Sequence, residues 1–226
     1  WSWSRGLGDV YKRQLLPSLQ AIKPLIGKDT TIITCMNGIP HWYFHKLDNK
    51  YANYKIKCLD PNLIIGTTLP PDNLVGSVVY PACEIVKPGT IKHIAGNRFS
   101  LGEPEGSESD RLKFISDILK RAGFRAPIQK NIRDEIWLKL IGNLSFNPIS
   151  ALTGATLEQI CNDQGTEAIV RAMMTEAKII AEELGAKINM SIEKRIDGAR
   201  KVGAHKTSML QDLSLIHISE PTRPTP

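Results

Sequence analysis

The chain has 226 residues, of which 42% are hydrophobic and 23% are charged, and its formal net charge is +6. This composition is typical of a globular protein of one or two domains, and no apolar run is long enough to cross a bilayer. The basic residues are scattered without interleaved aromatics, which favours a small anionic ligand over nucleic acid. The 4 cysteines lack metal-ligand spacing, so we expect reduced thiols and no bound metal.

The two ends of the chain differ in character from the rest. Residues 1–14 (WSWSRGLGDVYKRQ) have no usable period and no apolar segment of a signal peptide. Residues 214–226 (SLIHISEPTRPTP) are rich in proline and follow a helical pattern that breaks off after Leu213. Both segments resemble translated sequencing-library adaptor. We therefore expect both ends to be foreign and disordered, and residues 15–213 to form the fold.

The native part opens with a predicted helix and a predicted strand. Residues 15–27 predict an amphipathic helix that ends at Gly27. Its apolar face consists of Leu15, Leu19, Ile22, Leu25 and Ile26. Residues 30–36 form a β-branched apolar run, the pattern of a parallel strand buried on both faces. Asn37 follows this run, which places it at the carboxyl edge of an open α/β sheet, where such folds bind ligands.

The next hundred residues continue this α/β pattern, and residues 41–50 predict helix or irregular structure. Further short strands are predicted over residues 63–69, 76–80, 98–102 and 124–129. Residues 83–96 predict a hairpin, because Pro88 and Gly89 fit the centre of a type II turn. A capped helix is predicted to start near residue 110 and end at Gly123. Its inward residues are Leu112, Ile115, Ile118 and Leu119.

From residue 131 onward only helical periods occur. The predicted helices span residues 131–147, 156–161, 165–184 and 191–204. Pro148 is expected to end or kink the first of them, because proline has no N–H to donate. In the third, the inward stripe is predicted to be Ile169, Met173, Ala177, Ile180 and Leu184, with the methionine as core filler. We place a domain boundary near residue 130, with an α/β domain before it and an all-α domain after it.

A polar stripe accompanies the apolar face of the first of these helices. Lys139, Asn143 and Asn147 recur every fourth residue, so they lie along one border of that face. Partly buried polar groups need partners, and an ammonium with two carboxamides suits a small oxygen-rich anion. Two structural alternatives stay open. Lys139 pairs only with Glu135 at i,i+4, or the asparagines form local hydrogen bonds.

One motif of nucleotide-binding sheets does not occur. Such a domain normally opens with a strand and a glycine-rich phosphate turn, but residues 15–213 contain no GxGxxG. The first native element is instead the predicted helix. We therefore expect a partial Rossmann-like sheet domain that lacks its N-terminal nucleotide-binding strands.

Four blocks of sequence, in this order, resemble the ketopantoate reductase family. They are MNG at 36–38, GSVVYPA and KPGTIKHIAGNRFSLGEP within 76–104, IRDEIWLKLIGNLSFNPISALTG at 132–154 and HKTSMLQD at 205–212. The resemblance implies an NADP-binding domain over residues 15–130 and a helical substrate and dimerisation domain over residues 131–213, both incomplete, with the site in the cleft between them. It implies NADPH-dependent reduction of 2-dehydropantoate (ketopantoate) to (R)-pantoate in pantothenate and coenzyme A biosynthesis, by a cytoplasmic homodimer.

The resemblance also implies roles for individual residues. Lys139 falls on the general acid of the family. The substrate contacts fall on Asn37, Asn143, Asn147 and Ser208. Cofactor contacts fall on Asn37, which approaches both nicotinamide and substrate, and on Ala82. For Ser208 the structural alternatives are a helix N-cap and an exposed helix serine.

The chain departs from the family pattern in three places. The glycine-rich loop, the basic residue that prefers the phosphorylated cofactor and the closing acidic residue of an E-I-D segment are absent. The chain is therefore expected to bind NADPH weakly and to be inactive by itself. Two other functions stay open: an inactive fragment or dimerisation module of the family, and a related 2-keto or 3-hydroxy acid dehydrogenase, since a fold does not determine a substrate.

Overall fold

The computed structural model describes residue 15 and the ranges 18–87 and 89–215, so the predicted disorder of residues 1–14 and of 216–226 lies outside the described residues. The chain forms two compact units. The first unit runs to Leu140 and includes Ile180–Ile188, and the second consists of Ile141–Ile179 and the chain from Asn189 onward. This division falls inside a helix, after the change from sheet to helices near residue 130.

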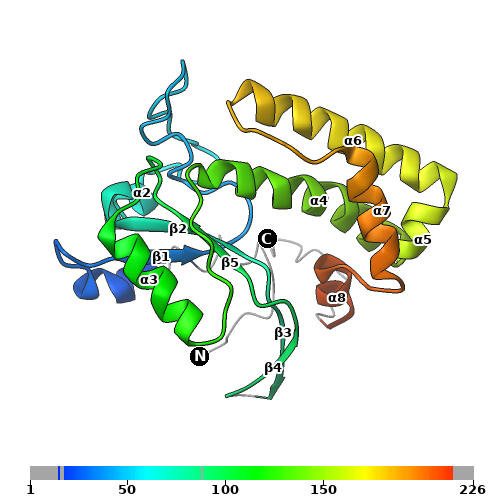
Figure 1. Cartoon of the computed structure of the whole chain (residues 1–226), viewed down its shortest axis with the longest axis horizontal. Helices are drawn as coiled ribbons and strands as arrows, with labels where there is room; N and C mark the ends of the chain where they lie inside the picture. Colours follow the sequence, from blue (N-terminus) through cyan, green and yellow to red (C-terminus); the bar gives the residue numbers. More distant parts are fainter. Residues whose placement is uncertain (1–14, 16–17, 88, 216–226) are drawn as a thin grey trace, which may run out of the picture. The chain divides into compact units, whose positions relative to one another are not determined.

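The first unit contains a three-stranded sheet in the order β1-β2-β5 (Figure 1). β1 (Ile32–Cys35) pairs in parallel with β2 (Leu74–Val79), and β2 pairs antiparallel with β5 (Phe99–Gly102). The predicted parallel strand is confirmed. Its predicted burial on both faces is wrong for Ile33, whose side chain is 40% exposed. The reason is that β1 has a single neighbouring strand among the described residues.

The predicted hairpin forms a separate two-stranded sheet. β3 (Ala82–Lys87) pairs antiparallel with β4 (Thr90–Ala95). Gly89 has a φ of 78°, the positive value that a type II turn requires at its second central residue. Every residue of β4 is exposed.

The segment predicted as a strand over residues 63–69 is instead a helix, α2 (Ile64–Thr68). The Asp60 carboxylate accepts hydrogen bonds from the backbone N–H groups of Ile65 at 3.1 Å and Gly66 at 2.8 Å. These bonds satisfy N–H groups at the start of the helix that have no partner within it. The periodicity of a short apolar run does not distinguish a strand from a buried helix. The Asp60 carboxylate, which lies before the run, therefore decides in favour of the helix.

The last predicted strand, over residues 124–129, is an extended segment beside β5. Two isolated parallel bridges connect it to the sheet, Arg98 with Arg125 and Leu101 with Ile128. Pro127 has no N–H to donate, so a continuous ladder cannot form there. The predicted strand is therefore wrong as an element, although the segment lies where a further strand would.

The amino-terminal helix is confirmed over residues 18–22, where Leu19 is buried. A 3₁₀ turn, η1 (Lys23–Leu25), follows with Pro24 near its start. The predicted inward orientation of Leu25 is wrong, because its side chain is 76% exposed. A 3₁₀ turn rotates by about 120° per residue instead of about 100°, which carries Leu25 off the apolar face.

α3 (Asp110–Arg121) begins and ends as the sequence predicts. The Ser109 hydroxyl caps it by accepting a hydrogen bond from the N–H of Leu112 at 3.2 Å, and Gly123 follows with a φ of 88°. Leu112 is fully buried, but Ile118, predicted to face inward, is 46% exposed. The buried face of the helix is therefore narrower than the apolar face predicted from its sequence.

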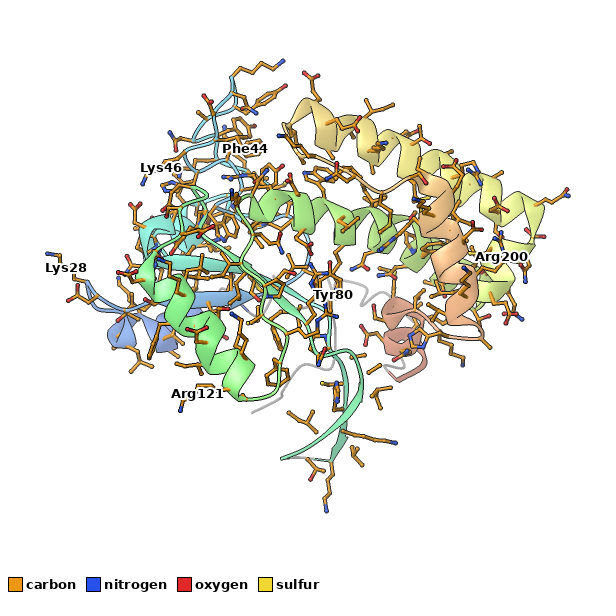
Figure 2. The ribbon with its side chains drawn as sticks, viewed as in Figure 1. Lys28, Phe44, Lys46, Tyr80, Arg121 and Arg200 are labelled. Atoms are coloured by element: carbon orange, nitrogen blue, oxygen red, sulfur yellow. The ribbon has the colours of Figure 1, made fainter. Side chains whose placement is uncertain are left out.

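A loop rich in aromatic residues packs on the first half of α4 (Ile132–Thr153). Residues 41–54 are irregular, one of the two predicted alternatives, and Figure 2 labels Phe44 and Lys46 within them. The indole N–H of Trp137 donates to the Tyr43 hydroxyl at 2.7 Å, and Arg133 donates to the Tyr43 backbone oxygen at 2.7 Å. These contacts hold the part of α4 that carries Lys139.

α4 continues through Pro148, so the first of the two predicted outcomes, a helix end at this residue, is wrong, and the alternative of a kink stays a prediction. A proline inside a helix removes one backbone hydrogen bond. Phe146 and Ile149, on either side of it, are only 5% and 8% exposed. Burial of these two side chains stabilises the helix across the missing bond.

The remaining predicted helices are confirmed as α5 (Leu157–Asn162), α6 (Gln164–Glu183) and α7 (Ile192–Val202). A further helix, α8 (Ser208–Leu215), was not among the predicted spans, and it passes the expected break at Leu213. Of the predicted inward stripe of α6, Ala177 is confirmed as buried, but Ile169 and Ile180 are wrong, because both side chains are about half exposed. The buried residues are Val170, Met174, Ala177 and Ala181. Apolar residues border the stripe on both sides, so the period alone could not decide which border is covered.

Among the described helices, none combines the length and the apolar character that a membrane span requires.

His41 makes the stability of the first unit depend on pH. Burial lowers the pKa of its imidazole below the ordinary value of 6.5, although Asp60 opposes the shift. Its Nε2 lies 3.1 Å from the backbone oxygen of Leu69, to which the neutral ring can donate. As the pH falls below 6.5, the unfolded chain binds a proton more readily than the folded chain does, so stability is lost. Above 6.5 both states are neutral and this contribution vanishes.

We therefore expect His41→Gln to flatten the loss of unfolding free energy below pH 6.5, by at most about 1.4 kcal/mol per pH unit. Urea unfolding at a series of pH values measures this slope. The exposed His93→Gln is the matched control. A slope equal to that of the unmodified chain contradicts the prediction.

Candidate functional site

Lys139 is half-buried in the part of α4 that belongs to the first unit. Its ammonium donates a hydrogen bond to the backbone oxygen of Val79, at the end of β2. The nitrogen also lies 4.7 Å from the ring centroid of Tyr80, which Figure 2 labels. A carbonyl acceptor and the face of an aromatic ring both stabilise the charged form of an amine. The nitrogen is therefore held by the Val79 carbonyl and the Tyr80 ring.

Tyr80 is itself held by the buried Glu135. The Glu135 carboxylate accepts hydrogen bonds from the Tyr80 hydroxyl at 2.8 Å, from Arg98 at 2.6 Å and from the Ser100 hydroxyl at 3.1 Å. The Arg98 guanidinium also lies 5.2 Å from the Tyr80 ring centroid. Glu135 fixes the aromatic ring against which Lys139 lies. The structural alternative, in which Lys139 pairs only with Glu135, is wrong, because the ammonium donates to the backbone oxygen of Val79.

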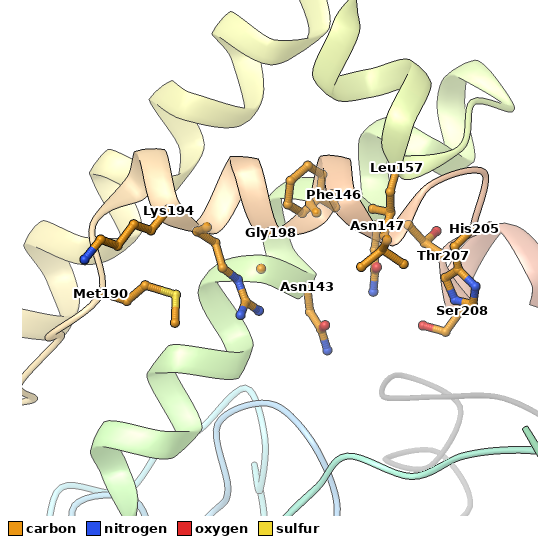
Figure 3. Close-up of a pocket in the computed structure, with 14 residues that line it drawn as sticks. Asn143, Phe146, Asn147, Leu157, Met190, Lys194, Gly198, His205, Thr207 and Ser208 are labelled. Carbon is orange, nitrogen blue, oxygen red and sulfur yellow. The ribbon is translucent and has the colours of Figure 1, made fainter. Parts of the chain in front are cut away.

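A pocket of about 460 Å³ lies within the second unit (Figure 3). Residues from α4, α7 and the start of α8 line it, among them Asn143, Asn147 and Ser208. The structure thus brings together three of the four residues that the resemblance assigned to substrate binding. Figure 3 shows both carboxamides projecting from α4 to the same side. The fourth-residue spacing of the sequence accounts for this alignment.

Local hydrogen bonds of the two asparagines and an N-cap role of Ser208 do not hold as alternatives, whereas a helix serine without a binding role stays open for Ser208, which is half-buried at the start of α8. Within the described part of the chain, neither the Asn143 nor the Asn147 carboxamide has a hydrogen-bond partner. α8 is capped by Thr207, whose hydroxyl accepts from the N–H of Leu210 at 3.3 Å, and Ser208 is the first helical residue. Half-buried amides without protein partners are suited to bind a ligand.

Asn37 and Ala82 belong to the first unit. Asn37 follows β1, and its Oδ1 atom is buried without a hydrogen-bond partner among the described residues. An unsatisfied buried oxygen is costly, so this atom suits a ligand that donates an N–H. Ala82 begins β3 and is exposed. Neither residue, nor Lys139, is among the residues that line the pocket of the second unit.

The pocket also contains residues that the sequence did not single out. Lys194 and Arg195 of α7 and His205 of the following loop line it, as does Gly142 of α4. Basic residues on an amphipathic helix usually form a solvated face. No signal in the sequence separated these from the other basic residues of α7.

The described residues include no group of three or more His, Cys, Asp and Glu side chains placed to hold a metal ion.

Comparison with known proteins assigns the chain to a family. The family described as "Ketopantoate reductase PanE/ApbA C terminal" matches residues 131–219. A 2-dehydropantoate 2-reductase of Mesorhizobium japonicum is 49% identical over 199 residues, which are 88% of this chain and 61% of that protein. The chain belongs to the ketopantoate reductase family. It spans about 61% of the length of this curated relative.

Solved structures agree with this assignment. A putative ketopantoate reductase from Ralstonia solanacearum superimposes with a TM-score of 0.85 at 40% identity, covering 88% of this chain and 62% of that one. D-Mandelate dehydrogenase in complex with NADH superimposes with a TM-score of 0.73 at 21% identity, covering 91% and 63%. The second likeness shows a shared fold. The predicted fold class, a partial α/β sheet domain followed by helices, is confirmed.

Proposed function

We propose that the full-length reductase, by which we mean the product of the uninterrupted reading frame around residues 15–213, reduces ketopantoate to (R)-pantoate with NADPH. The observation that supports this most is the pocket lined by two unpartnered carboxamides and the Ser208 hydroxyl. The polar stripe of α4 that supplies these amides also includes Lys139. The curated relative at 49% identity is a 2-dehydropantoate 2-reductase.

Reduction of a 2-keto acid needs a hydride at the carbonyl carbon and a proton at its oxygen. The nicotinamide supplies the hydride when it is bound. As negative charge develops on the oxygen, the Lys139 ammonium stabilises it and transfers a proton from Nζ to form the hydroxyl. Asn143 and Asn147 donate N–H groups to the hydroxyl and keto oxygens of the substrate. The Ser208 hydroxyl donates to the carboxylate.

The residues present fit a nicotinamide. The buried Asn37 Oδ1 has no partner among the described residues, and a carboxamide N–H of the nicotinamide would satisfy it. Ala82 is small and exposed, so a cofactor can approach its backbone. The choice of NADPH over NADH is part of the proposal. The resemblance to the family supports it.

Tyr80 is proposed as a positioning residue that acts through Lys139. Tyr80→Leu removes the ring that faces the ammonium, and a cation over an aromatic face is stabilised by roughly 0.5–2 kcal/mol. We expect kcat to fall by about 2- to 30-fold in this variant, because the ring no longer stabilises the charged amine. Because the protonated lysine is the active form, the basic limb of kcat against pH moves to lower pH.

Tyr80→Phe is the matched control. It keeps the ring and removes only the hydroxyl bonded to Glu135, so we expect a smaller shift of the basic limb. Equal losses of kcat in both variants with an unmoved limb would show that Tyr80 only supports the fold.

The test of the proposed function is a steady-state assay of cofactor oxidation by the full-length reductase. Ketopantoate, 2-oxoisovalerate and phenylglyoxylate are compared as substrates, each with NADPH and with NADH. We expect the highest kcat/KM for ketopantoate with NADPH. A higher value for another keto acid would favour a related dehydrogenase, and no oxidation with any of them would favour the inactive family member.

Two further expectations accompany this proposal. A homodimer is tested by sedimentation of the full-length reductase. A cytoplasmic location is supported by the cysteines, because Cys35, Cys58, Cys83 and Cys161 are all free thiols.

A further inference from the structure

We propose that Arg195 is the anion-binding residue of the pocket in the second unit, and that position 142 is glycine because the Arg195 guanidinium lies against it. The ligand is a small carboxylate whose charged group Arg195 binds. The inference deepens the proposed function and rests on it only for the identity of the acid, ketopantoate.

The charge of the pocket favours an anion. Of the 14 residues that line it in the described part of the chain, Lys194 and Arg195 are cationic and none is acidic. Lys194 is exposed, whereas Arg195 is half-buried. Charges interact more strongly where water is partly excluded, so Arg195 is the cation better placed to hold a bound carboxylate.

The contact between Arg195 and Gly142 carries the inference furthest. A Cβ atom built on Gly142 would lie 2.2 Å from Nη2 of Arg195 and 3.0 Å from both its Cζ and its Nε. Real Cβ atoms essentially never lie within 3.0 Å of another heavy atom, so the flexible end of the Arg195 side chain would have to move for any other residue at position 142. Glycine is a poor helix former, yet it lies in the middle of α4. Its presence there admits the guanidinium.

This contact fixes where the charge lies. Gly142 directly precedes Asn143 on α4, and Arg195, Gly142 and Asn143 line the same pocket. A guanidinium is planar and matches a carboxylate with two parallel hydrogen bonds. Arg195 therefore supplies recognition of the acid group, and the carboxamides remain for the other oxygens of the ligand. The pocket then selects a keto acid over the uncharged ester or ketone of the same shape.

The test is a titration of the 226-residue chain, followed by the side-chain amide signals of Asn143 and Asn147 in NMR spectra. The probes are ketopantoate, phenylglyoxylate and the uncharged methyl ester of ketopantoate. We expect Arg195→Met to raise the Kd for the acid by about 10- to 100-fold, as loss of a charged hydrogen-bond partner commonly does. The affinity for the ester should change little.

Gly142→Ala displaces the guanidinium without removing its charge. We expect it to raise the Kd for the acid by about 5- to 50-fold and to add nothing further in the Arg195→Met background, because both changes remove one interaction. Alanine favours the helix, so the variant should fold. Gly198→Ala is the matched control, because a Cβ there meets no atom within 4 Å in the same pocket. Lys194→Met removes an equal charge and should change the Kd by less than about 3-fold.

The possible results of these titrations test the anion site and the proposed substrate separately. Arg195-dependent binding of phenylglyoxylate without binding of ketopantoate supports the anion site and removes the proposed substrate. Binding of ketopantoate with equal affinity by the Arg195→Met variant overturns the inference and leaves the proposed function standing. Failure of the unmodified chain to bind either acid, or an equal effect of Lys194→Met and Arg195→Met, also overturns it.

Discussion

Replacing Lys139 with alanine in the full-length reductase is expected to lower kcat by roughly 10²–10⁴-fold, the usual contribution of a general acid. The proton that completes the reduction then has to come from water, and the developing alkoxide loses the ammonium that stabilises it. KM should change much less, because the carboxamides, Ser208 and Arg195 still hold the substrate. Steady-state kinetics with saturating NADPH measure both constants.

The pH dependence provides a second readout for the same substitution. The basic limb of kcat that reports loss of the lysine proton should disappear in Lys139→Ala. Lys50→Ala is the control, because Lys50 pairs with Glu183 at an exposed position, where both side chains are more than 60% exposed. A Lys139→Ala variant with near-normal kcat would remove this lysine from the role of proton donor.

The largest expected effect on stability belongs to Glu103. Its side chain is fully buried, and its carboxylate accepts hydrogen bonds from Arg111 at 2.8 Å and 2.5 Å and from the Ser109 hydroxyl. Arg111 also donates to the backbone oxygens of Asp72 at 2.7 Å and Leu74 at 3.2 Å. This set of contacts ties the start of α3 to the start of β2, the central strand of the sheet.

Glu103→Ala is expected to lower the free energy of unfolding by about 3–5 kcal/mol, because it leaves the Arg111 charge without its carboxylate. Glu103→Gln keeps the shape and one acceptor, so a smaller loss is expected. Urea unfolding followed by circular dichroism at pH 7 measures both. Asp117→Ala is the control on the same helix. It breaks an exposed pair with Lys120, which is expected to contribute less than about 1 kcal/mol. Equal losses for Glu103→Ala and Asp117→Ala would contradict the prediction.

Local patterns were sufficient for much of the fold. The hairpin over β3 and β4 followed from proline and glycine at its turn, and α3 from Ser109 at its cap. The helices after residue 131 followed from their apolar period. In each case the decisive groups lie within a few residues of one another along the chain, so tertiary contacts were not needed to recognise the element.

The errors arose where a contact outside the recognised pattern decided the outcome. The run over residues 63–69 became a helix because Asp60 caps its N–H groups. α4 passed Pro148 because Phe146 and Ile149 are buried on either side. Residues at the borders of apolar stripes, such as Ile118 and Ile180, became exposed because packing covered less of each helix than its period allowed.

The candidate site also has one part that the sequence predicted and another that required the structure. The sequence by itself determined that Lys139, Asn143 and Asn147 share one side of a helix, because the helical repeat imposes that alignment on residues four apart. Only the tertiary structure decided that Tyr80 faces the lysine and that Arg195 lies against Gly142. These contacts join residues more than fifty positions apart, and no periodic pattern encodes which distant side chain will fill a given space.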